Sequence, residues 1–169
     1  MKLVKLRNVY PEAKILNNFM EIAIEQARLG MRNNHGGPFG AVIVKDKTVI
    51  SRAHNRVLDS NDPTAHAEIM AIRMASSKLK TFDLSECEIY TTSYPCPMCM
   101  SALYWARIQT LYYGTTMTEV EKIGFDDGQI YRALCKDHND TGMNMEKLDS
   151  KECQQLLSEW EEKEDKHMY

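Results

Sequence analysis

Two short segments, His66-Ala67-Glu68 and Pro95-Cys96-Pro97-Met98-Cys99, together carry the strongest signal in this sequence. Each segment alone is a weak signal, because a lone C-x-x-C pair can also be a redox dithiol or half of a zinc ribbon. Together they offer one imidazole and two thiols, a ligand set that suits Zn²⁺. Both segments lie at or near a proline that begins a predicted helix, where the helix dipole stabilises thiolates.

The residues of these segments have different expected roles. We expect His66, Cys96 and Cys99 to hold zinc, and three protein ligands leave a fourth position for water, as in catalytic zinc sites. Glu68 lies two residues from His66, close enough to reach that water without binding the metal. Zinc lowers the pKa of such a water toward ~7, and a carboxylate can then carry its protons. The order H-x-E, then P-C-x-x-C, is the signature of the zinc nucleobase deaminases.

Hydrophobic periodicity around the two segments predicts a layered α/β sheet. Helices are predicted at 17–31, 62–79, 97–106 and 150–163, and strands at 39–44, 48–52, 88–92 and 110–114. The helix 62–79 is expected to begin at the N-cap Asp62, with Pro63 in its first position. The polar stretch 137–149 predicts a strand only weakly.

Length and composition bound the function. The 169 residues, 43% of them hydrophobic, predict one domain with a substantial core. The chain has no apolar run near the ~20 residues that span a bilayer and no visible signal peptide, so no membrane partner is expected. Lys and Arg total 21 against 24 Asp and Glu, a net charge of −3, and no basic block predicts a nucleic-acid partner.

The remaining cysteines and histidines are expected to be bystanders. Five cysteines are an odd number without a disulfide framework, which predicts a cytoplasmic, reducing compartment. Cys87, Cys135 and Cys153 are expected to be ordinary, semi-buried residues. His35 and His54 are expected in loops near the pocket, without a ligand role.

Further segments resemble the bacterial-type guanine deaminases of the cytidine-deaminase-like superfamily. These are GGPFGAVIV at 36–44, SNDPTAHAE at 60–68, YWAR at 104–107, GFDD at 124–127 and IY at 130–131. The resemblance implies a three-layer αβα fold, with a mixed central sheet of about five strands and helices on both faces. It also implies a zinc-dependent aminohydrolase that converts guanine, a small-molecule purine base, to xanthine and ammonia.

The same resemblance implies the substrate contacts. Asp127 would accept from the N1–H and 2-amino donors of guanine and help move protons to the leaving ammonia. Asn55 would hydrogen-bond the purine and Phe39 would stack on its ring, with Ala67 and Tyr169 completing the site. Structural alternatives stay open, because Asp127 could cap the following segment, Asn55 could be a turn residue and Phe39 could belong to the core.

The resemblance finally implies a homodimer in which the C-terminal segment 150–169 of one chain covers the site of the other. Tyr94 stands where the superfamily commonly carries Glu, so the substrate is less defined than the reaction class. Alternative substrates are guanosine, cytosine, an aminated triazine or adenosine in tRNA, the last disfavoured by the acidic charge. A catalytically inactive zinc-stabilised binding protein is the alternative from another class, and the presence of Glu68 argues against it.

Overall fold

The computed structural model describes the backbone of residues 11–135 and 151–165, and the side chains of 18–135 and 153–165. The chain divides into two compact units, Met1–Asp127 and Gly128–Tyr169. The first contains the helices α1 (Pro11–Arg32), α2 (Val57–Ser60), α3 (Ala67–Leu79), α4 (Pro97–Trp105) and α5 (Met117–Glu121) and the strands β1 (Gly40–Lys45), β2 (Thr48–His54), β3 (Glu88–Ser93) and β4 (Thr110–Thr115).

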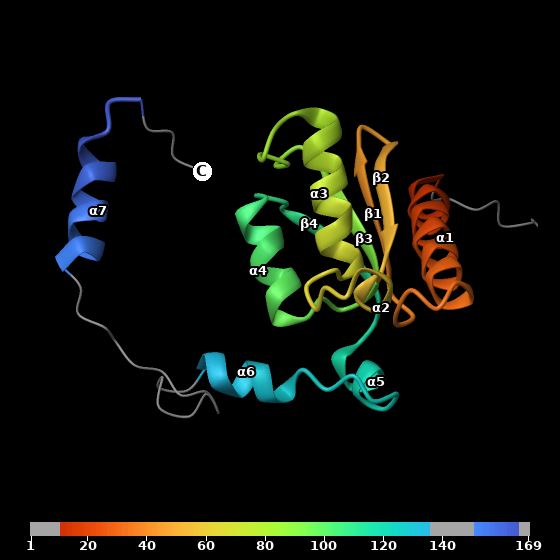
Figure 1. Ribbon diagram of the computed structural model, residues 1–169. Coiled ribbons are helices and arrows are strands. Elements are labelled where there is room, and N and C mark those ends of the chain that lie inside the picture. The colour runs from red at the N-terminus through yellow and green to blue at the C-terminus, as the bar shows by residue number, and fades with distance from the viewer. Residues whose placement is uncertain (1–10, 136–150, 166–169) are drawn as a thin grey trace, which may run out of the picture. The chain divides into compact units, whose positions relative to one another are not determined.

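The sheet of the first unit has the strand order β2-β1-β3-β4. β1 pairs antiparallel with β2 and β3, whereas β3 and β4 are parallel, so the sheet is mixed. α1 covers one face of the sheet, and α3 and α4 cover the other (Figure 1). The predicted three-layer α/β class is therefore confirmed. The described residues form four strands rather than about five, and the weakly predicted strand in 137–149 lies outside them.

Alternation along β1 divides the core between the two faces of the sheet. Ala41 and Ile43 pack in the cluster that includes the inner residues of α3 and α4. Val42 and Val44 point the other way, into a cluster with Phe19 of α1. All four β1 side chains are fully buried, which explains why this strand is a continuous apolar run in the sequence.

Small residues let the helices approach the sheet closely. A Cβ on Gly40 would lie 2.0 Å from the carbonyl oxygen of Ala23, so glycine permits α1 to pack against the start of β1. On the opposite face, Ala71 and Ala75 of α3 are fully buried against the strands. The hydroxyl of Ser51 on β2 donates to the carbonyl of Ala71 over 2.8 Å and joins α3 to the sheet.

The predicted start of α3 at Asp62 is wrong, because the segment before Ala67 forms a turn. The Asp62 carboxylate accepts from the backbone N–H and the hydroxyl of Thr64, over 2.8 and 2.7 Å. Its carbonyl also accepts from the N–H of Ala65 over 3.0 Å. Asp62 therefore uses its capping capacity in the turn. His66 has extended backbone angles and becomes the N-cap of α3.

Three further elements of the first unit differ from the prediction. α1 begins at Pro11, earlier than expected, with proline in the first turn that favours it. The short helices α2 and α5 were not predicted. α5 begins with a capping box, in which the Thr116 hydroxyl accepts from the N–H of Glu119 and the Glu119 carboxylate accepts from the N–H of Thr116.

The second unit contains α6 (Gly128–Cys135) and α7 (Lys151–Glu162), and α7 agrees closely with the predicted helix 150–163. Cys135 and Cys153 are exposed, which corrects the expectation that they are semi-buried, whereas Cys87 of the first unit is buried. Within the described ranges, no helix combines the length and apolar character needed to cross a membrane.

Candidate active site

The three predicted metal ligands converge at the ends of two helices. His66 is the N-cap of α3, and Cys96 is the N-cap of α4, just beyond the carboxyl end of β3. Pro97 occupies the first turn of α4 and Cys99 follows within that turn. The Nδ1 atom of His66 lies 3.5 Å from the Cys96 sulfur and 3.6 Å from the Cys99 sulfur.

This donor set fits a zinc ion. Its three ligand atoms lie within 4.8 Å of one another, and no other such group of three occurs in the described residues. Tetrahedral zinc with Zn–S bonds of about 2.3 Å and Zn–N bonds of about 2.0 Å separates the nitrogen from each sulfur by about 3.5 Å. The two observed separations match that value, so the side chains are already spaced for the metal.

The protonation of the three side chains is coupled. Hydrogen bonds from Cys99 and His66 lower the pKa of Cys96 to about 4, which makes it a thiolate at neutral pH. The hydrogen bond to Cys96 raises the pKa of His66 and, together with burial, that of Cys99. A divalent cation would displace the remaining protons, because it binds thiolates and neutral imidazole.

Glu68 lies in the first turn of α3 beside this donor set, as predicted. Glu68 is only 6% exposed. Burial raises the pKa of its carboxyl group above the ordinary value because the charged form is poorly solvated. A carboxyl group in such a setting can accept and return a proton near neutral pH. Ala67, between His66 and Glu68, is fully buried at the beginning of the helix.

Asn55 follows β2 and is also buried, at 4% exposure. Its backbone N–H donates to the carbonyl of Phe39 over 3.0 Å, and its side-chain oxygen accepts from the N–H of Val57 over 3.2 Å. The turn alternative is therefore correct for the oxygen. The side-chain nitrogen has no partner among the described residues, which leaves it able to donate to a ligand.

Phe39 has the core role considered for it, and its stacking on a substrate ring stays a prediction. It packs against the buried cluster between the sheet and α3, and it lines a cavity of about 520 Å³ next to α1 and the carboxyl ends of β3 and β4. Phe125 meets it edge to face, with ring centroids 4.9 Å apart. Sequence reasoning assigned no role to Phe125. Its aromatic character beside Asp127 was the available signal.

Asp127 is the last residue of the first unit and is partly buried. Burial raises the pKa of its carboxyl group, and the charges of Cys96 and His66 act on it as well. The structure thus brings Asp127 within electrostatic range of the metal ligands, as its predicted role requires. Tyr169, predicted to contact the substrate, lies outside the described residues.

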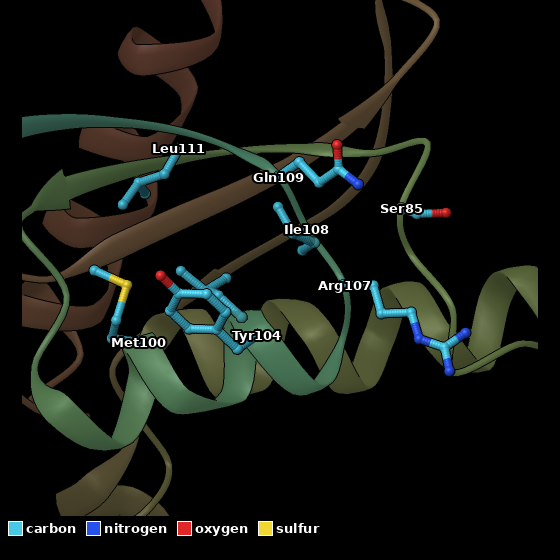
Figure 2. A pocket seen from close by; sticks show the side chains of 8 residues that line it. Ser85, Met100, Tyr104, Arg107, Ile108, Gln109 and Leu111 are labelled. Atoms are coloured by element: carbon cyan, nitrogen blue, oxygen red, sulfur yellow. The ribbon is translucent and has the colours of Figure 1, made fainter. Parts of the chain in front are cut away.

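A second cavity, of about 560 Å³, lies along α4 and the segment that leads into β4. Figure 2 shows Met100 and Tyr104 of α4 on one side of it and Leu111 of β4 on another. None of the predicted catalytic, metal-binding or substrate-binding residues lines it. The candidate active site is therefore the donor set with Glu68, not this cavity.

Residues 13–115 match the family described as the cytidine and deoxycytidylate deaminase zinc-binding region. The chain belongs to this deaminase family. The guanine deaminase of Bacillus subtilis (strain 168) is 47% identical over 118 residues, 70% of this chain and 76% of that protein. A tRNA-specific adenosine deaminase of Agrobacterium fabrum is 46% identical over 97 residues, 57% of this chain and 63% of that protein.

Solved structures agree with the family assignment. The X-ray structure of guanine deaminase from Bacillus subtilis superimposes with a TM-score of 0.87 at 38% identity, covering 90% of this chain and 98% of the other. A guanine deaminase from Nitrosomonas europaea matches with a TM-score of 0.61 at 31% identity, covering 76% and 79%. The predicted fold, enzyme class and zinc dependence of this deaminase are confirmed by these matches.

Proposed function

We propose that this deaminase hydrolyses guanine to xanthine and ammonia. The observation that carries the proposal is the placement of the buried Glu68 carboxyl group beside the group His66, Cys96 and Cys99. The likeness to the guanine deaminase of Bacillus subtilis supports guanine as the substrate. We also propose that the enzyme works in the cytoplasm, where free thiols persist.

The predicted substrate-contact residues offer the chemistry that guanine requires. Guanine offers N1–H and an exocyclic 2-amino group as donors, and O6 and N7 as acceptors. The carboxylate of Asp127 can accept from the donor edge, and the free amide nitrogen of Asn55 can donate to an acceptor. The ring of Phe39 offers an aromatic surface for the flat base, and Phe125 supports that ring from its edge.

Proton transfer is the task of Glu68 in this proposal. A zinc ion held by His66, Cys96 and Cys99 would supply a Lewis acid that makes water nucleophilic near neutral pH. Glu68 accepts one proton from the water whose oxygen bonds to C2 and passes it to the ring nitrogen; it then takes the remaining proton from the new hydroxyl group on C2 and delivers it to the amine. The C2–N bond breaks, ammonia leaves with help from Asp127, and C2 becomes the carbonyl of xanthine.

A substrate panel tests the proposed reaction. Ammonia release is measured with zinc-loaded protein on guanine, guanosine, cytosine, cytidine, adenine and a tRNA anticodon stem. We expect guanine to be preferred by at least about 10²-fold in kcat/KM, because buried polar groups left unpaired reject a wrong base strongly. Ammonia release from one of the other compounds but not from guanine would identify that compound as the substrate instead. Ammonia release from none of them would contradict the enzyme assignment.

We further propose that residues 1–169 act as one domain within a homodimer, with the segment 150–169 exchanged between chains. α7 supports an exchanged segment, because Leu156 and Leu157 are 64% and 71% exposed. Trp160 on the same helix is 42% exposed, so three large apolar side chains are available to a partner surface. Tyr169 of one chain would then complete the site of the other.

Mixing two inactive variants tests the exchange. One variant carries Glu68→Gln, and the other lacks residues 166–169. In an exchanged dimer, the intact tail of the first covers the intact Glu68 site of the second, so random mixing restores about a quarter of wild-type activity. An unexchanged dimer regains none, which would contradict the exchange, and a monomer in analytical ultracentrifugation would contradict the dimer itself.

A further inference from the structure

Two histidines that the proposed reaction does not use form a partly buried contact next to Asn55. His35 lies in the loop after α1, and His54 is the last residue of β2 rather than a loop residue. The Nδ1 atom of His35 lies 2.9 Å from the Nε2 atom of His54. The two rings stack, with centroids 5.1 Å apart and planes inclined by 26°.

The residues that follow the two histidines also contact one another, and one of them is Asn55. A Cβ on Gly36 would lie only 2.0 Å from the side-chain oxygen of Asn55, so the loop backbone rests directly on the amide group. Farther along the loop, the Phe39 carbonyl accepts from the backbone N–H of Asn55. The loop after α1 and the end of β2 thus meet around the Asn55 side chain, which is proposed to bind the substrate. The contacts are those between residues 35 and 54, 36 and 55, and 39 and 55.

Both histidines are held from outside the pair. The His35 carbonyl accepts from the N–H groups of Leu58 and Asp59, over 3.0 and 3.2 Å. The Asp59 carboxylate pairs with Arg56 through one oxygen, and its other oxygen lies 4.0 Å from Nε2 of His35. On the far side, α1 packs closely on the His54 ring, since a Cβ on Gly30 would lie 2.8 Å from it. Because both rings are held by these contacts, a change in the hydrogen bond between them is expected to move the neighbouring residues.

We propose that His35 and His54 are positioning residues that hold Asn55 for the purine, and that an added proton on the pair displaces Asn55. The proposal rests on the proposed function in one respect, the contact between Asn55 and the substrate. His35 and His54 touch neither the substrate nor the metal ligands in this scheme.

The donors and acceptors of the two rings explain why an additional proton disrupts the pair. With both rings neutral, the tautomer that leaves no buried N–H unpaired has Nε2–H of His54 donating to Nδ1 of His35, and Nδ1 of His54 then carries a lone pair. That Nδ1 atom is buried and has no partner among the described residues. An additional proton either sets two N–H groups against each other or places an N–H at this buried position without an acceptor.

The surrounding charges act in the same sense. Burial lowers the pKa of His54, and the charges of His35 and Arg56 lower it further, whereas Asp59 opposes them. His54 therefore stays neutral through neutral pH and takes up a proton only below the ordinary histidine pKa of about 6.5. Binding of the purine at Asn55 is expected to weaken over that lower range.

His54→Gln separates positioning from titration, because glutamine can keep an N–H toward His35 but takes up no proton. We expect the wild-type KM for guanine to rise about tenfold between about pH 7.5 and about pH 5, and that of His54→Gln to stay nearly constant. His54→Ala should raise KM about tenfold at both pH values, with a smaller change in kcat. Arg52→Gln, an exposed change on the same strand, is the control and should follow the wild type.

An equal rise of KM in His54→Gln at low pH would overturn the proposal. A second measurement does not depend on turnover. The side-chain amide resonances of Asn55 are assigned by their loss in Asn55→Asp and are followed by NMR across the same pH range. They should shift together with the His54 ring in the wild type and stay fixed in His54→Gln. Constant Asn55 resonances during His54 titration would also overturn it, whereas absence of guanine turnover with coupled resonances would reject only the proposed function.

Discussion

Replacing Glu68 by glutamine is expected to lower kcat for guanine deamination by about 10⁴-fold, the upper end of what a general acid–base contributes. Glutamine has nearly the shape of glutamate and can keep its hydrogen bonds, but it cannot accept a proton from water or return one to the amine. Because Glu68 is buried, no solvent-exposed base is expected to replace it. The measurement is the steady-state rate of ammonia release at saturating guanine.

The matched control for this variant is Glu86→Gln. Glu86 is exposed and pairs with Lys45 at the surface, so the same chemical change there should alter kcat less than about twofold. Metal content, measured by atomic absorption, should be unchanged in both variants, since Glu68 is not one of the proposed ligands. More than a tenth of wild-type activity in Glu68→Gln would show that another group moves the protons.

Replacing Cys96 by serine is expected to remove the bound zinc and to lower activity by about 10³-fold or more, since the metal contributes several kcal/mol to the transition state. Serine offers a neutral hydroxyl where the site offers a thiolate, because the hydrogen bonds from Cys99 and His66 lower the pKa of Cys96 to about 4. Loss of a ligand that binds only the folded state should also lower the Tm.

Chelation of the wild type provides the companion measurement. Metal removal should abolish ammonia release and lower the Tm, and added zinc should restore both in the wild type but not in Cys96→Ser. Cys135→Ser, a change at an exposed cysteine of the second unit, should keep its zinc and its activity. Full activity in metal-free wild-type protein would contradict zinc-dependent catalysis.

Sequence patterns predicted a helix or strand correctly where a single short segment contains the residues that specify it. The apolar runs predicted β1 and β3 because their side chains are buried on both faces of the sheet. Pro97 predicted the start of α4, and with it the position of Cys96 and Cys99. The same reasoning failed at Asp62, whose carboxylate is committed to the turn at Thr64 rather than to a helix cap.

Other features depend on partners that are distant in the sequence. Asn55 was equally consistent with a turn residue, and its side-chain oxygen does accept a hydrogen bond in the turn, while its side-chain nitrogen has no partner in the described part of the chain. The contact between Phe39 and Phe125 joins two segments of the first unit that are far apart in the sequence. The pairing of His35 with His54 likewise requires the loop after α1 to fold back on the end of β2. No local periodicity encodes such contacts, so sequence patterns could not predict them.

By itself, the sequence predicted the donor set and the carboxyl group that we propose for proton transfer. His66, Glu68, Cys96 and Cys99 occupy two segments whose nearby helix starts orient them, and their chemistry admits few other uses. The tertiary structure alone decided what surrounds that centre. The pairing of β1 with β3, and the packing of the loop after α1 against Asn55, bring separate segments together through burial and long-range hydrogen bonds. Such contacts join residues that are distant in the sequence, so local propensity does not specify them.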